Sequence, residues 1–164
     1  MEGRLTRAEG LGIRAALATL AASALISSTQ LRATSYAPPI AFFEWNSVSL
    51  TPEATAQLIR EVEWWIAEYR SYGSEIGWVC INGYADRSGP TAHNEVIAHR
   101  RAERVRDILS ARRLLPRDIT IRSFGEARNL RETEDGVRER LNRRVEVNLM
   151  RADASQANPR LGCR

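Results

Sequence analysis

The chain has 164 residues, of which 43% are apolar and 27% are charged, and this composition is typical of one globular domain with a hydrophobic core. It excludes a wholly disordered chain. The net charge of +4 resembles that of nucleic-acid-binding proteins, but the first 37 residues hold four arginines against two glutamates, so half of the surplus lies there. Two cysteines are too few for a fold that depends on disulfides.

A basic segment at the N-terminus precedes an uncharged apolar run over residues 15–26. The run has the length of a signal-peptide core, about 7–15 residues, and is shorter than the roughly 20 residues that span a bilayer. We expect residues 1–37 to be a signal peptide, or an N-terminal anchor if it is not cleaved, followed by a linker. The alternative is a buried or frayed alanine-rich helix. No cysteine follows the run closely, so a lipoprotein attachment site is not expected.

Hydrophobic spacing predicts a strand over residues 40–45 and then a helix. Thr51 is the expected N-cap of this helix, Pro52 its first residue and Gly73 its end. Trp64 and its neighbour are expected to pack rather than to stack on a ligand. The face expected to cover the core consists of apolar residues at steps of three and four: Leu58, Val62, Trp65, Ile66 and Tyr69.

The following residues predict a nearly continuous apolar strand over 75–86 and a helix from about 91 to 113. Further along, apolar and polar residues alternate, which predicts strands over 118–125 and 143–150. The polar stretch between these two strands, residues 132–141, is compatible with another helix.

This β-α-β-α-β-(α)-β order predicts an α/β (α+β) two-layer sandwich, in which helices cover one face of a mixed sheet. Residues 38–150 are expected to form this domain, and residues 151–164 a flexible polar tail. Cys80 lies in an apolar strand and is expected to be a buried, inert thiol, with Cys163 exposed in the tail.

A charged residue interrupts the apolar face of the second predicted helix. Arg101 is in line with Ile97 and Val105, so its side chain either extends past the edge of the core or faces a pocket. Asp86 ends the preceding strand, where helix N-termini and ligands meet in such sheets. A zwitterion would suit this arrangement, because its ammonium could bind Asp86 and its carboxylate Arg101. The alternative is that Asp86 and Arg101 pair with each other.

Several separated motifs lie between residues 40 and 149. They are FFEWNSVSLTPEA, GYADRSGPTAHNEVIAHRRAERVRDIL, IRSFGEARN and LNRRVEVNL. Together they resemble the OmpA-like C-terminal domain, the peptidoglycan-binding module that is shared with Pal lipoproteins and the flagellar stator protein MotB.

The resemblance implies non-covalent binding of peptidoglycan through the diaminopimelate of its stem peptide, without catalysis or a cofactor. Asp86 matches the residue that receives the diaminopimelate ammonium, and Arg101 matches the one that holds its carboxylate. Asn142, Arg143 and Arg144 match a late motif and are interpreted mainly as structural, with a ligand or glycan contact as the alternative. Ligand contacts are also implied for three further positions: Asn94, Ser88 and Asn46.

By the same resemblance we expect a periplasmic, wall-associated protein of a Gram-negative envelope. Association with the outer membrane and with envelope protein partners is compatible with this, and a membrane would be contacted only through an uncleaved N-terminal segment. Ala85 departs from the family pattern, in which a threonine precedes the aspartate, and this change could weaken binding. Ala98 and Asn129 also replace family residues.

Other classes of function fit the sequence less well. His93 and His99 do not share a helical face, and no further residues complete a metal site, so neither a metal nor an enzyme is expected. The arginine-rich segment 99–113 could lie along a nucleic acid, but Glu103 and Asp107 interrupt it, and no nucleic-acid partner is expected. A degenerate domain that acts as a periplasmic protein-interaction module is the alternative to wall binding.

Overall fold

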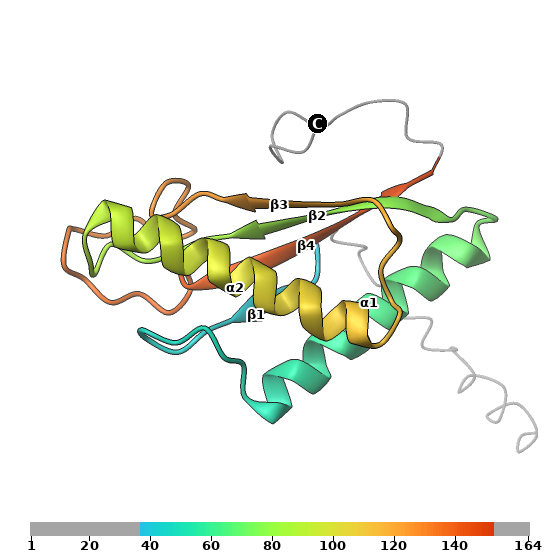
Figure 1. Cartoon of the computed structure of the whole chain (residues 1–164), viewed down its shortest axis with the longest axis horizontal. Coiled ribbons are helices and arrows are strands. Elements are labelled where there is room, and N and C mark those ends of the chain that lie inside the picture. The colour runs from blue at the N-terminus through green and yellow to red at the C-terminus, as the bar shows by residue number, and fades with distance from the viewer. Residues whose placement is uncertain (1–36, 153–164) are drawn as a thin grey trace, which may run out of the picture. The chain divides into compact units, whose positions relative to one another are not determined.

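The computed structural model describes residues 37–152, which form a mixed four-stranded sheet and two helices (Figure 1). The predicted leader and most of the predicted tail, including Cys163, lie outside the described residues. The strands are β1 (Ile40–Phe42), β2 (Ile76–Gly83), β3 (Ile119–Ser123) and β4 (Arg144–Arg151). The helices are α1 (Pro52–Ser71) and α2 (Thr91–Ala111).

The sheet has the strand order β1-β4-β2-β3. β2 and β3 are parallel, whereas β4 is antiparallel to both of its neighbours, β1 and β2. α1 and α2 pack on the same face, because their buried residues form one core with those of the sheet. The predicted two-layer fold with a mixed sheet is therefore confirmed.

Apolar side chains at alternate positions of the strands point to this one face and form the core there. Val79 and Ile81 of β2 are fully buried there, and Ile81 lies opposite Val147 of β4. Burying each such side chain contributes about 1.5–3 kcal/mol. They pack against buried residues of both helices, among them Leu58, Val62, Val105 and Leu109.

Both ends of α1 follow the sequence prediction. The Oγ1 atom of Thr51 accepts a hydrogen bond from the N–H of Ala54 (3.1 Å), and Pro52 occupies the first turn, where its missing N–H has no cost. Beyond the helix the chain turns at Gly73, whose φ of 68° favours glycine. Neither helix within residues 37–152 combines the length and the apolar character that crossing a bilayer requires.

Two side chains differ from the prediction. Trp64 is 42% exposed and contacts Trp65 edge to face, with ring centroids 5.1 Å apart, because adjacent helix residues cannot both face the core. Cys80 is buried, as predicted, but it is disulfide-bonded rather than an inert thiol.

Residues 132–141 do not form the predicted helix, and the chain runs there through turns and extended segments. The N–H of Glu139 donates to Oδ2 of Asp86 (3.1 Å). The Asn142 amide accepts from the N–H of Arg131 (2.9 Å) and donates to its carbonyl (2.7 Å). Side chains thus bond the N–H groups of Glu139 and Leu141 and fix the chain on both sides of the stretch, and the prediction of a helix is wrong.

The sheet and α2 approach each other closely at the end of β2. A Cβ atom added to Gly83 would lie 2.0 Å from the carbonyl oxygen of Ala98 in α2, and Ala98 is itself fully buried. The glycine of the GYAD motif is therefore required by a backbone contact. This contact holds the first turns of α2 beside the end of β2.

We predict that Gly83→Ala lowers the free energy of unfolding by about 3 kcal/mol or more, at the upper end of overpacking costs, because the clashing oxygen belongs to the helix backbone. Urea unfolding followed by circular dichroism measures this. Gly136→Ala is the control: its φ of 81° disfavours alanine, but no atom lies within 4 Å, so a loss of about 1 kcal/mol is expected. Equal losses in both variants would contradict the backbone contact.

Candidate functional site

A small cavity of about 60 Å³ lies where β2 ends and α2 begins. All five residues that the sequence predicted for the site line it: Asn46, Asp86, Ser88, Asn94 and Arg101. Its wall is completed by Trp45, Ala85, Gly89, His93, Ile97 and Arg143. The fold therefore brings together the loop after β1, the loop between β2 and α2, the first turns of α2, and the residue before β4.

Arg101 is the largest fully buried side chain of the described residues, with 1% exposed. Its Nε donates to the carbonyl of Ser47 (2.8 Å), its Nη2 to that of Glu44 (3.2 Å) and its Nη1 to that of Tyr84 (3.4 Å). The side chain lines the pocket and does not extend past the edge of the core. Within residues 37–152 these bonds leave two of the five N–H groups without an acceptor.

The charges around Arg101 favour an anion. Burial and the nearby Arg143 guanidinium lower the pKa of Arg101 to about 10, with Asp86 acting in the opposite direction. Arg101 is still a cation at neutral pH. Two guanidinium groups and one carboxylate thus line the cavity and leave a net positive charge there.

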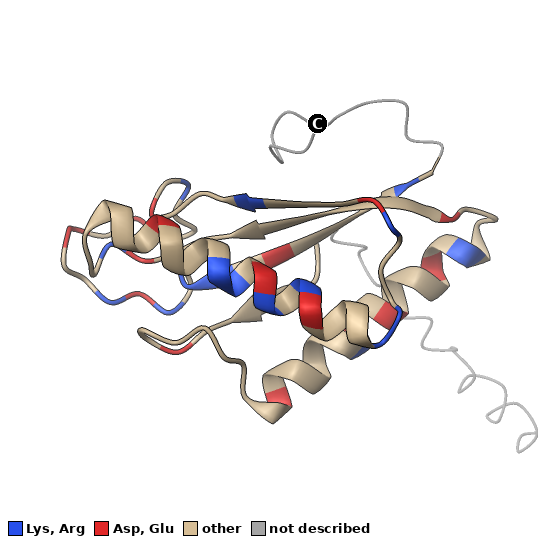
Figure 2. Ribbon diagram, viewed as in Figure 1, with Lys and Arg blue, Asp and Glu red and all other residues tan. Residues whose placement is uncertain are grey.

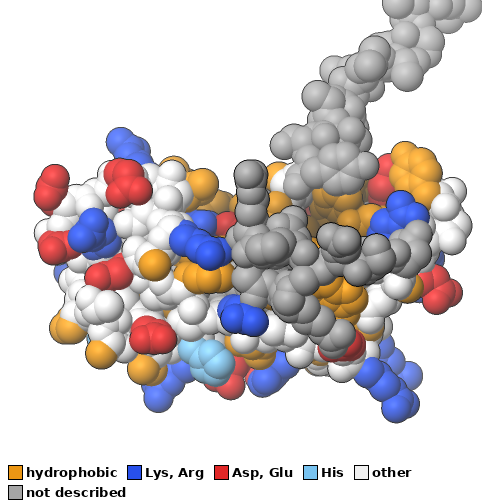
Figure 3. Space-filling model, turned by 90° about the horizontal axis from the view of Figure 1, so that it is seen from above, with side chains coloured by type: hydrophobic (Ala, Val, Ile, Leu, Met, Phe, Trp, Pro, Cys, Tyr) orange, Lys and Arg blue, Asp and Glu red, His pale blue; other side chains and the backbone are white. Residues whose placement is uncertain are grey.

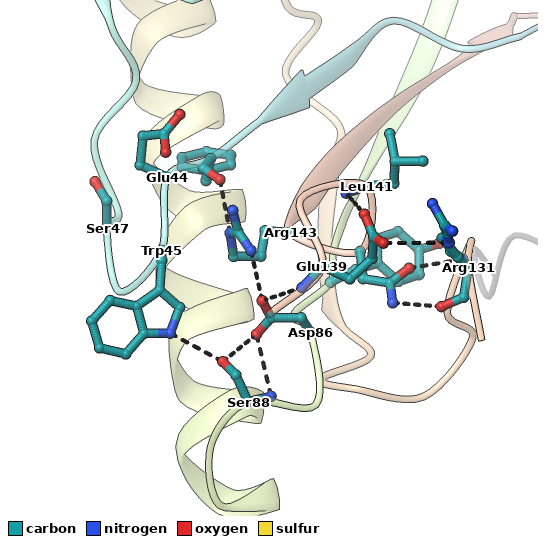
Figure 4. Close-up of polar contacts among 12 residues, drawn as sticks. Glu44, Trp45, Ser47, Asp86, Ser88, Arg131, Glu139, Leu141 and Arg143 are labelled. Carbon is teal, nitrogen blue, oxygen red and sulfur yellow. Dashed lines mark hydrogen bonds and ion pairs between the residues drawn. The ribbon is translucent and has the colours of Figure 1, made fainter. Parts of the chain in front are cut away.

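Asp86 is held by four donors (Figure 4). Its Oδ2 accepts from Nη1 of Arg143 (2.7 Å) and from the N–H of Glu139 (3.1 Å). Its Oδ1 accepts from Oγ of Ser88 (2.6 Å) and from the N–H of the same residue (3.4 Å). Asp86 therefore pairs with Arg143, and the alternative in which it pairs with Arg101 is wrong.

The pKa of Asp86 is lowered. Burial alone would raise it, but the hydrogen bonds from Ser88 and Arg143, the charge of Arg143 and the Glu139 N–H together outweigh burial. The carboxylate consequently stays ionised below its usual range.

Arg143, which the sequence interpretation treated mainly as structural, also lines the cavity. Its side chain is 7% exposed, and its Nε donates to the carbonyl of Phe43 (3.1 Å). Antiparallel pairing places the start of β4 beside the end of β2, since Gly83 lies opposite Val145. In the motif LNRRVEVNL an arginine comes just before a strand in which apolar and polar residues alternate. This pattern does not show which other strand pairs with it.

Asn94 connects the start of α2 to its surroundings. Its amide donates to the carbonyl of Gly89 (2.9 Å) and to Oε2 of Glu126 (2.6 Å), whose other oxygen accepts from Oγ1 of Thr91 (2.8 Å). Pro90 is the N-cap and offers no side-chain acceptor. Asn94 thus holds the loop before α2 in place at the cavity wall.

Trp45 is a residue of the site that sequence reasoning missed. Its indole Nε1 donates to Oγ of Ser88 (3.1 Å), and the guanidinium of Arg138 lies 3.6 Å from its ring centroid. Asn46 follows with a φ of 52°, a left-handed conformation that asparagine tolerates better than most residues. The signal in the sequence that could have identified Trp45 is an aromatic residue at the end of FFEW, and this residue is not part of the buried core.

Residues 37–152 contain no cluster of three His, Cys, Asp or Glu side chains that could hold a metal ion. His93 is exposed at the cavity, and His99 lies 3.7 Å from Glu103.

The arginine-rich part of α2 presents no continuous cationic face, because Arg101 is buried and Arg106 pairs with Asp107 (2.8 Å). Acidic and basic residues are interspersed along the helix (Figure 2) and over the face seen in Figure 3.

Comparison with known proteins assigns the family. The model of the OmpA family matches residues 42–143, and the chain therefore belongs to this family. Membership of this family of structural envelope domains confirms the prediction that the domain is not an enzyme.

Two curated relatives are named as envelope proteins. The peptidoglycan-associated lipoprotein of Rhizobium meliloti (strain 1021) is 31% identical over 94 residues, which cover 57% of this chain and 50% of that protein. Outer membrane protein A of Escherichia fergusonii is 30% identical over 114 residues, or 64% of this chain and 45% of that protein. The chain thus spans half or less of the length of these relatives.

Solved structures share the fold. The peptidoglycan-associated lipoprotein from Burkholderia pseudomallei has a TM-score of 0.56 at 20% identity, covering 68% of this chain and 90% of that chain. The OmpA-like domain of FopA1 from Francisella tularensis has a TM-score of 0.51 at 19% identity, covering 70% and 74%.

We predict that Asp86 stabilises the fold near neutral pH and that this stabilisation is lost on acidification. Because its pKa is lower in the folded state, the ionised carboxylate favours folding above the unfolded value of 3.8, and the gain disappears as the pH falls through the folded value. The difference in melting temperature between wild type and Asp86→Asn should therefore shrink from pH 7 to pH 2. For Asp107→Asn, an exposed control, it should be small at every pH. A pH-independent difference for Asp86→Asn would contradict the lowered pKa.

We predict strong coupling between Asp86 and Arg143. Asp86→Ala or Arg143→Ala alone should cost about 3–5 kcal/mol, because each leaves a buried charge without its partner. The double variant should cost much less than the sum. Urea unfolding of the four proteins gives the coupling free energy, and the exposed pair Arg106–Asp107 is the control, with less than about 1 kcal/mol expected. Additive losses at Asp86 and Arg143 would contradict the ion pair.

Proposed function

We propose that the domain binds peptidoglycan without covalent chemistry, through the diaminopimelate of the stem peptide, and so attaches the protein to the cell wall. Family membership supports the proposal, since one relative is named as peptidoglycan-associated. The observation that carries it is the buried guanidinium of Arg101, which lines a cavity together with the ionised Asp86.

The end of a diaminopimelate side chain carries an ammonium and a carboxylate on one carbon atom. Asp86 would accept hydrogen bonds from the ammonium, and Arg101 would donate its remaining N–H groups to the carboxylate. The cavity volume of about 60 Å³ is enough for a few water molecules. It therefore accepts the end of one amino-acid side chain but not a sugar ring.

Ligand binding would change the hydrogen bonds of Asp86. Its two oxygens already accept from four donors, so an ammonium has to replace one of them. The hydroxyl of Ser88 can rotate away, because its oxygen also accepts from Nε1 of Trp45. Arg143 is fixed by the Phe43 carbonyl and would stay. Ala85 offers no hydroxyl to the cavity, which would make binding weaker than with a threonine.

The four hydrogen bonds that Asp86 already accepts favour one other function. If the Asp86–Arg143 pair is purely structural, the domain is a degenerate member of its family that acts as a protein-interaction module in the envelope. The two functions differ in one property, which is whether the wall retains the isolated protein.

We further propose that the protein lies in the periplasm in contact with the wall and is associated with the outer membrane directly or through protein partners. The envelope names of the relatives support this location. The export signal that it requires would lie in residues 1–37.

We predict that diaminopimelate-type sacculi retain the full-length chain and release Asp86→Ala and Arg101→Ala, because each loss costs about 2–5 kcal/mol of binding once the charges are desolvated. A sedimentation assay at moderate salt measures the bound fraction. Arg100→Ala removes the adjacent exposed arginine and should bind like wild type. Melting temperatures show whether each variant is folded, and Arg101→Lys, which keeps the charge but not the fork of donors, should also bind weakly.

Walls with lysine in the stem peptide provide the test of the ligand. Lysine lacks the second carboxylate, so Arg101 would have no partner and retention should fall. Full retention of Asp86→Ala and Arg101→Ala would contradict the proposed site. A folded wild type that neither wall retains would favour the protein-interaction module.

A further inference from the structure

Trp45 extends the site beyond the cavity. The residue lines the cavity, yet it is 47% exposed. Its orientation is fixed by the hydrogen bond from Nε1 to Ser88 and by the Arg138 guanidinium above its ring. Figure 4 shows the indole pointing outward from the loop after β1, with its nitrogen toward Ser88.

The exposed position of Trp45 is not explained by packing. Tryptophan side chains are enriched at the hot spots of binding interfaces. Two other exposed apolar residues, Val48 and Val137, belong to the same two segments, which the contact between Trp45 and Arg138 joins. Because its two polar contacts already orient the ring, little side-chain entropy is lost when a ligand packs on it.

We propose that Trp45 is a second subsite, which takes a sugar ring of the glycan strand that carries the stem peptide. This inference rests on the proposed function. The cavity holds only the end of one side chain, so the rest of the ligand must leave across its mouth, where Trp45 lies. A pyranose ring presents a face of C–H groups that packs on an indole. Its hydroxyl and acetamido oxygens can accept hydrogen bonds from the neighbouring Arg138.

Two soluble ligands test the subsite with the full-length chain. One is a stem tripeptide that contains diaminopimelate, and the other is the same peptide attached to the disaccharide of N-acetylglucosamine and N-acetylmuramic acid. Calorimetric titration should give about three- to ten-fold tighter binding of the ligand with sugars, the size of one aromatic contact. Trp45→Ala should reduce this ratio to about one, whatever its effect on the absolute affinities.

Two further variants separate the ring from other effects. Trp45→Phe keeps a ring without the N–H and should retain most of the preference for the ligand with sugars. Trp64→Ala removes a similarly exposed tryptophan of α1 and should leave the preference unchanged. Equal affinity of wild type for both ligands, or a preference that survives Trp45→Ala, would overturn the subsite but not the proposed function. Binding of neither ligand by a folded wild type would overturn both.

Discussion

The buried ion pair between Asp86 and Arg143 joins the segments from which the site is built. Arg143 connects the start of β4 to the end of β2 through Asp86 and to the end of β1 through the carbonyl of Phe43 (Figure 4). The same carboxylate oxygen of Asp86 also accepts a hydrogen bond from the N–H of Glu139, which fixes the loop before β4. A buried pair of this kind adds little net stability, because desolvation offsets most of the attraction. Its effect is to hold one arrangement of three chain segments around one cavity.

The pair also determines the charge of the cavity. Arg143 neutralises Asp86, so the second guanidinium, that of Arg101, donates its hydrogen bonds to main-chain carbonyls and lies 5.3 Å from the centroid of the Phe43 ring. Carbonyl dipoles compensate a buried cation less well than a carboxylate does, and burial lowers the pKa of Arg101 accordingly. A core selected for stability alone would favour an apolar side chain at this position. The protein instead maintains a fixed, desolvated cation beside an ionised carboxylate, which is the property that a zwitterionic ligand requires.

Close packing between α2 and the sheet holds these polar side chains in position. Gly83 allows the backbone of α2 to contact β2, and the fully buried residues of β2, β4 and both helices form one core on one face of the sheet. α2 therefore cannot shift without disturbing that core. α2 thus carries Arg101 and the loop between β2 and α2 carries Asp86, whereas the loop after β1 supplies Trp45 and Asn46 at the edge of the cavity.

The sequence by itself determined the features that depend on neighbours in the chain. Apolar periodicity and the cap at Thr51 predicted the helices, and the motifs from FFEW to LNRRVEVNL identified the family and five of the residues that line the cavity. Only the tertiary structure decided that Asp86 pairs with Arg143, that residues 132–141 form a loop, and that Trp45 stays exposed. The physical reason is that they depend on contacts between segments far apart in the chain. Trp45 is held by Ser88 and Arg138, and the Asp86–Arg143 pair depends on the antiparallel pairing of β4 with β2. That pairing brings distant residues together through hydrogen bonds that hydrophobic periodicity does not encode.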